Sequence, residues 1–169
     1  MGTVRARVGG AIGGYDVQAT VTPTTIAGRI GGVFSGMDIN LTYNLAAGSI
    51  EGRIGGLFWG QDVSGQISSS HLSVRIGGTL AGNDLTLSAT GNNITGRCGG
   101  DVFGFDIDLE FDRGVRATGR LGGPVLGMSI DGFVEDAPTV IAGFLFALTY
   151  YIYKLNHRNH GSSSGSSSR

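Results

Sequence analysis

Hydrophobic and polar positions alternate with a period of two along most of the chain, which indicates β-strands with one buried face. Ile39, Leu41 and Tyr43 fall on one side of such a strand, and Asn40 and Thr42 fall on the other. The same alternation recurs in the other apolar segments before residue 136. We therefore predict antiparallel strands with a polar outer face and an apolar inner face.

A motif of the form Arg-apolar-Gly-Gly-x-apolar-x-Gly-x-Asp-apolar recurs six times, and its copies start 22 to 24 residues apart. Cys98 replaces the usual aliphatic residue in one copy, and Ser129 replaces the usual aspartate in another. A period of this length indicates an array of one supersecondary unit. We predict a domain of six β-hairpins, hence about twelve strands, over residues 1–136. The copies begin at Arg7, Arg29, Arg53, Arg75, Arg97 and Arg120.

The turn within each hairpin is expected at the Gly-x pair that precedes the aspartate, because a two-residue type II′ turn needs glycine at its first position. With Gly36-Met37 as the turn, Phe34 lies opposite Ile39 and every apolar side chain stays on one face. The loops at the other ends of the strands have three or four residues. Their lengths place Asp106 opposite Arg120 and Glu110 opposite Arg116.

The pattern changes after residue 136 to an unbroken apolar run over 139–155, which predicts a hydrophobic helix within 137–157. The Ser/Gly-rich tail 158–169 has the composition of a disordered segment. We favour a closed barrel around this helix, because inward glycines such as Gly28 and Gly32 leave room for it. The alternative is an open repeat sheet with a transmembrane tail helix, although the length is at the lower limit for a membrane span.

In the order and number of its elements, the chain resembles the tubby C-terminal-like group, which includes phospholipid scramblases and plant LURP-one-related proteins. The resemblance extends over roughly residues 4–158. It implies twelve strands in a barrel closed around a hydrophobic C-terminal helix, and a scaffold role or one close to lipid. No functional residue is carried over, because the Arg-apolar-Gly-Gly repeat is not a motif of that group.

Charge and composition narrow the function further. The net charge of −1 does not favour a nucleic-acid partner, and the single cysteine excludes a disulfide framework. The N-terminus lacks the apolar stretch of a secretion signal, so a cytoplasmic location is expected, or anchoring to a membrane by the C-terminal helix in the alternative. We find no catalytic, cofactor-binding or metal-binding constellation, and we predict that the protein is not an enzyme.

Two surfaces are candidates for binding. Leu57, Trp59 and Phe103 lie near the predicted turns on the polar side and form a predicted contact patch. Repeated arginines at equivalent positions form a predicted belt that could face phosphates or lipid headgroups, or could instead neutralise nearby acids. The belt consists of Arg29, Arg53, Arg75, Arg97 and Arg120.

These features predict a non-enzymatic β-barrel scaffold or interaction module, close to lipid, with an unknown protein or lipid partner. Two alternatives stay open at this point. One is a tail-anchored membrane protein that displays a β-repeat domain, in which the helix 139–155 contacts the membrane. The other is a structural repeat protein that associates with itself through exposed strand edges.

Overall fold

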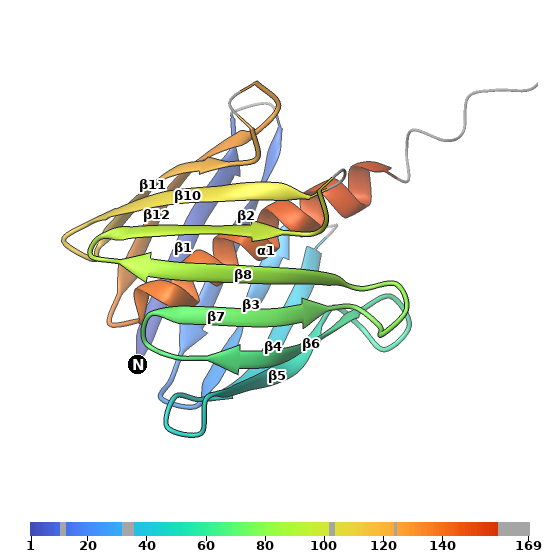
Figure 1. Ribbon diagram of the computed structural model, residues 1–169, viewed down its shortest axis with the longest axis horizontal. Coiled ribbons are helices and arrows are strands. Elements are labelled where there is room, and N and C mark those ends of the chain that lie inside the picture. The colour runs from blue at the N-terminus through green and yellow to red at the C-terminus, as the bar shows by residue number, and fades with distance from the viewer. Residues whose placement is uncertain (11–12, 32–35, 102–103, 124, 159–169) are drawn as a thin grey trace, which may run out of the picture.

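The computed structural model describes residues 1–10, 13–31, 36–101, 104–123 and 125–158. Twelve antiparallel strands form a closed barrel in which sequence neighbours pair and β1 pairs with β12 (Figure 1). The strands are β1 (Gly2–Gly9), β2 (Gly14–Val21), β3 (Thr25–Gly31), β4 (Gly36–Asn44), β5 (Ser49–Ile54), β6 (Gln61–Ile67), β7 (His71–Ile76), β8 (Asn83–Thr90), β9 (Asn93–Cys98), β10 (Phe105–Asp112), β11 (Arg116–Leu121) and β12 (Met128–Glu135). They are followed by one helix, α1 (Thr139–Arg158).

The predicted fold class is confirmed, and its alternative is wrong. The sheet is not open, because β1 and β12 pair along six residues from Thr3↔Glu135 to Val8↔Ile130. Edge-to-edge association requires unpaired strand edges, and closure of the barrel pairs these two edges with each other.

The described residues also lack the transmembrane tail helix of that alternative. Among the described residues, no helix combines the length and the apolar character that a membrane span requires.

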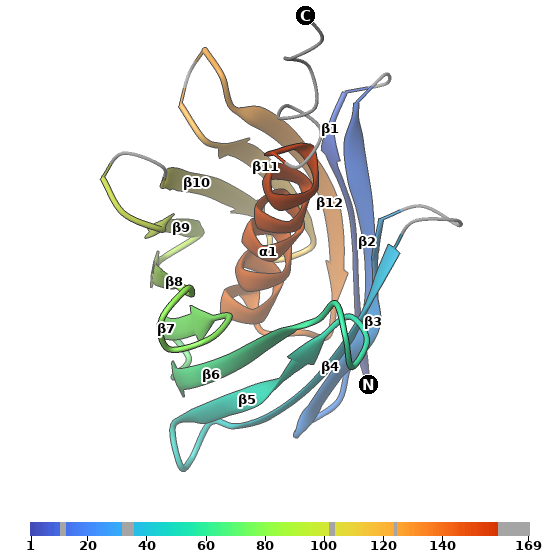
Figure 2. The ribbon, with the colours of Figure 1, turned by 90° about the vertical axis from the view of Figure 1, so that its right-hand side faces the viewer.

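Helix α1 lies inside the barrel and is surrounded by strands (Figure 2). Every residue from Val140 to Ile152 is buried, so no face of this stretch is left for solvent. Twelve strands about 4.8 Å apart and tilted by about 40° enclose a backbone ring roughly 24 Å across. A helix about 10–12 Å thick, together with one layer of strand side chains, fills that space. Thr149, a buried polar residue of the core, donates a hydrogen bond from its hydroxyl to the Leu145 carbonyl at 2.7 Å.

The inward glycines have a different role from the one expected. A Cβ atom on Gly28 or Gly96 would overlap the backbone carbonyl of the adjacent strand, at Gln18 or Thr86 respectively, and its nearest neighbours would be strand atoms. Glycine at these positions therefore permits tight strand curvature in the barrel wall. Gly132 is the case that fits the original expectation, because its Cβ would lie 3.0 Å from Cζ of Phe146 on α1.

The predicted two-residue turns are also wrong. Gly36 pairs with Gly31, so the pairing of Phe34 with Ile39 does not occur, and Phe34 itself lies outside the described residues. In β5–β6, Ile54 pairs with Gln61, which leaves six residues in the loop. The shift involves an even number of positions, so each side chain that stays within a strand keeps its predicted face although the partners change.

The predicted charge pairs are wrong for a separate reason, because the register across the β10–β11 loop is shifted by two residues. Asp106 lies opposite Arg97, and Arg120 lies opposite both Asp108 on β10 and Ser129 on β12. Glu110 lies opposite Thr118 on β11 and not opposite Arg116.

Candidate functional site

The end of the barrel at which α1 finishes carries the repeated motif. The chain passes here from each odd-numbered strand to the following even-numbered strand, and we call this end the rim (Figures 1 and 2). Figure 2 looks at the rim, with the loops arranged around the end of the helix. The sequence Gly-Gly-x-x-x-Gly forms the six-residue loops between β5 and β6, and between β7 and β8.

The first glycine of these loops needs a backbone conformation that other residues rarely adopt. Gly55 has φ of 82°, and Gly77 has φ of 96° at the equivalent place in the next loop. Its amide then reaches the neighbouring hairpin: Gly55 N–H donates to the Asp38 carbonyl at 2.7 Å, and Gly77 N–H donates to the Asp62 carbonyl at 2.8 Å. Backbone hydrogen bonds therefore connect one rim hairpin to the next.

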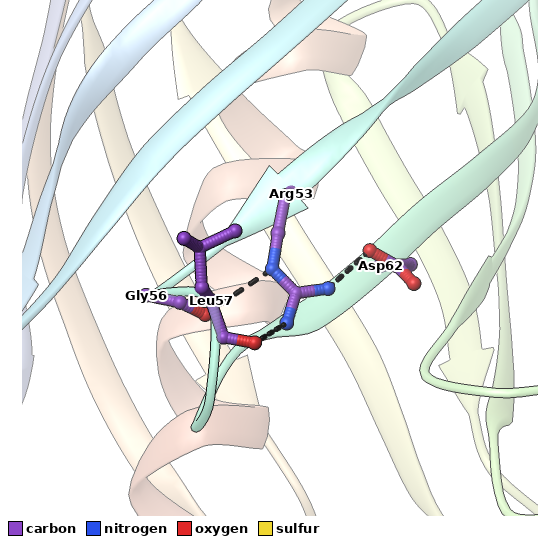
Figure 3. A network of polar contacts seen from close by, with 4 residues as sticks. All are labelled: Arg53, Gly56, Leu57 and Asp62. Atoms are coloured by element: carbon purple, nitrogen blue, oxygen red, sulfur yellow. Dashed lines mark hydrogen bonds and ion pairs between the residues drawn. The ribbon is translucent and has the colours of Figure 1, made fainter.

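The arginine of each motif supports its own loop, as Arg53 shows (Figure 3). Its Nη1 forms an ion pair with Asp62 across the hairpin at 2.5 Å. Its Nε donates to the Gly56 carbonyl at 3.2 Å, and its Nη2 donates to the Leu57 carbonyl at 3.0 Å. One guanidinium group therefore binds two carbonyls of the loop and one carboxylate of the next strand.

This arrangement recurs around the rim. Equivalent ion pairs have N–O distances between 2.5 and 3.1 Å, and arginines of other motifs also donate to loop carbonyls, at Gly10, Thr79 and Gly100. Exposed pairs of this kind contribute only about 0.2–1 kcal/mol each, so their main effect is on loop geometry. The pairs are Arg7–Asp16, Arg29–Asp38, Arg53–Asp62, Arg75–Asp84 and Arg97–Asp106.

The predicted arginine belt exists as a row of equivalent positions, but its charge is locally balanced. Arg29, Arg53, Arg75 and Arg97 each bind an aspartate, which favours the interpretation that the arginines neutralise nearby acids. Arg120 differs, because Ser129 replaces the aspartate and accepts a hydrogen bond from Nη1 at 3.4 Å. At four of the five belt positions, the arginine charge is therefore balanced by an aspartate.

Large apolar side chains project from the loops into solvent. Leu57 and Trp59 of the predicted contact patch are each 86% exposed at the β5–β6 tip, whereas Phe103 lies outside the described residues. Four more side chains, which sequence reasoning missed, are between 86 and 100% exposed on the rim. The available signal was the apolar residue inside each Gly-Gly-x-x-x-Gly segment, which the two-residue turn had wrongly assigned to strands. We call the described set the rim tips: Leu57, Phe58, Trp59, Leu80, Val125 and Leu126.

The mouth of the barrel beneath the rim tips is closed by aromatic and amide groups. Asn83 donates to the Tyr151 hydroxyl at 3.2 Å, and Asn156 donates to the Tyr15 hydroxyl at 3.0 Å. The Tyr150 ring packs edge-on against Phe105 with a centroid distance of 4.7 Å. These contacts join the end of α1 to strands around the barrel.

A small pocket at this mouth contains Cys98 and Lys154. Burial raises the pKa of the Cys98 thiol to about 12, so the thiol stays protonated and is a weak nucleophile at neutral pH. Desolvation, together with the charge of Arg158, lowers the pKa of Lys154, whose ammonium lies 5.4 Å from the Phe105 ring centroid. The pocket therefore places a thiol that is not activated beside a lysine whose pKa is lowered.

Within the part of the chain that the structure describes, no three His, Cys, Asp or Glu side chains are placed to hold a metal ion. Comparison of the chain with protein-family models, curated proteins and solved structures gives no match. The resemblance to the tubby C-terminal-like group therefore stays a prediction, and the rim geometry is the basis for the functional proposal.

Proposed function

We propose that this protein is a non-enzymatic β-barrel interaction module that associates peripherally with lipid surfaces through its rim. The observation that carries the proposal is the exposure of the six rim tips at one end of a rigid barrel. Exposed apolar groups of this size cost free energy in water and mark contact surfaces when they gather in one region. A cytoplasmic location stays a prediction that accompanies this proposal.

The construction of the barrel supports a scaffold role. Helix α1 fills the interior, and the repeated arginines and aspartates are engaged with each other and with loop carbonyls. The module therefore offers a preformed surface, which reduces the entropic cost of binding. Its partner contacts should depend on the rim tips and not on a deep cavity.

Vesicle flotation with mixed zwitterionic and anionic phospholipids tests the proposal. The purified protein should float with the vesicles, and Leu57→Ser/Phe58→Ser/Trp59→Ser should weaken partitioning roughly a hundredfold or more, because three large side chains no longer leave water. The matched control is Leu45→Ser/Val115→Ser/Phe133→Ser, which changes three exposed apolar residues outside the rim.

The control removes three exposed apolar side chains from the opposite end and the outer wall, and its binding should equal that of the wild type. Absence of vesicle binding by the wild type, or equal loss in both triple variants, would reject the rim as a lipid-binding surface. Light scattering without vesicles tests the second candidate function, self-association: a stable dimer or larger assembly that the rim substitutions dissolve would favour it.

A further inference from the structure

The rim tips occupy opposite sides of the barrel mouth. In the closed order of the twelve strands, the β11–β12 loop lies six strands away from the β5–β6 loop. Val125 and Leu126 therefore face Leu57, Phe58 and Trp59 across the barrel axis. From strand spacing and tilt, the two groups are roughly 24 Å apart, less any inward or outward lean of the loops.

From this placement we infer that the rim enters the interfacial layer of an uncharged phospholipid bilayer with the barrel axis upright, so that tips on opposite sides insert together. The inference rests on the proposed lipid association and specifies its driving force and geometry. A fluid bilayer surface is flat over this distance and can meet tips on both sides at once. A peptide ligand, or the groove of a partner protein, would contact the rim tips on one side of the barrel mouth only.

The spaces between the tips favour lipid over a rigid protein surface. A Cβ atom at Gly56, Gly78 or Gly123, in the loops that carry the tips, would meet nothing within 4 Å. The tips are themselves 86 to 100% exposed, so they stand apart and do not pack into one continuous patch. Acyl chains and headgroups can fill such gaps, whereas a protein partner would need a matching set of protrusions to reach interior packing density.

Several backbone carbonyls of the loops already accept hydrogen bonds from the protein, so they depend less on water. An unsatisfied carbonyl costs several kcal/mol when it is removed from water, which normally opposes insertion of a loop. Arg53 donates to the carbonyls of Gly56 and Leu57, and Gly127 N–H donates to the Gly123 carbonyl within the β11–β12 loop. These bonds lower the desolvation penalty of the loops that carry the tips.

Local charge balance identifies the lipid class. Five motif arginines are paired with five aspartates around the rim, so these ten groups contribute little net charge that could attract anionic headgroups. Binding should therefore come from apolar burial and from the interfacial preference of tryptophan. It should change less than about threefold between roughly 0.05 and 0.5 M salt, because screening acts on charge attraction.

Trp59 provides a direct reporter, because it is the only tryptophan of the chain and lies at a rim tip. On addition of phosphatidylcholine vesicles, its emission should shift to the blue and should be quenched by lipids that carry a bromine or nitroxide on the upper acyl chain. A second protein, Trp59→Phe/Val125→Trp, places the reporter on the opposite side. Quenching of both reporters supports upright insertion.

Other outcomes separate the two proposals. Quenching on one side alone would overturn the upright orientation. Binding that requires anionic lipid and disappears at high salt would overturn apolar burial as the driving force. In both cases the proposed lipid association would stand. Absence of binding to vesicles of either composition would overturn both proposals. A blue shift without vesicles, accompanied by dimer formation in light scattering, would assign the rim tips to a second copy of the chain and overturn the inference.

Discussion

Replacement of Phe146 by alanine tests whether α1 supports the barrel from inside. The side chain is 0% exposed and lies in the middle of the helix. Its ring stacks on Phe111 with a centroid distance of 6.3 Å, and the backbone of β12 approaches it closely at Gly132. The surrounding wall is a hydrogen-bonded closed sheet, which can collapse little into the space that the substitution leaves.

The expected loss is therefore near the usual range for a buried phenylalanine, about 3–5 kcal/mol in the free energy of unfolding. For a chain of this length, that loss corresponds to a decrease of roughly 6–20 °C in Tm. Urea denaturation followed by far-ultraviolet circular dichroism measures it, since Trp59 is exposed in the folded protein and reports poorly on the core.

Phe58→Ala is the matched control, because it removes the same atoms from a side chain that is 90% exposed. Its free energy of unfolding should stay within about 0.5 kcal/mol of the wild type. The reasoning would fail if the free energy of unfolding of Phe146→Ala were within about 1 kcal/mol of the wild-type value, or no lower than that of Phe58→Ala. The helix would then not be the packed centre of the barrel.

Two further predictions concern the barrel wall. Gly96→Ala should lower the free energy of unfolding by about 1–3 kcal/mol, because the new methyl group overlaps the Thr86 carbonyl. Gly100→Ala in the same hairpin is the control and should be nearly neutral in urea denaturation. Equal effects of the two substitutions would contradict the curvature role of Gly96. Because burial raises the Cys98 pKa from 9.0 to about 12, the folded state holds the thiol proton more tightly, so stability should fall as pH rises above 9. Cys98→Val should remove a slope of about 1.4 kcal/mol per pH unit between pH 9 and 12, measured by denaturation at several pH values; unchanged slopes would refute the assignment.

The alternation of apolar and polar residues, with the six-fold motif, determined the antiparallel hairpins, the division of faces and the helix within 137–157. These features follow from local periodicity, in which each side chain is assigned to a face by its position along the chain. The enclosed helix could also be predicted, because a segment such as Val140–Ile152, apolar on all sides, needs protein or lipid around it.

Tertiary structure decided the pairing of the strands and the nature of the rim. A shift by an even number of residues preserves the face of every side chain, so the alternation could not distinguish a two-residue turn from the six-residue loop after Ile54. The loop exists because Gly55 reaches the Asp38 carbonyl of another hairpin and Arg53 binds both its own loop and Asp62. These contacts form only when the register between neighbouring strands is set, which the alternation alone leaves open, and the six-residue loop then carries rim tips into solvent.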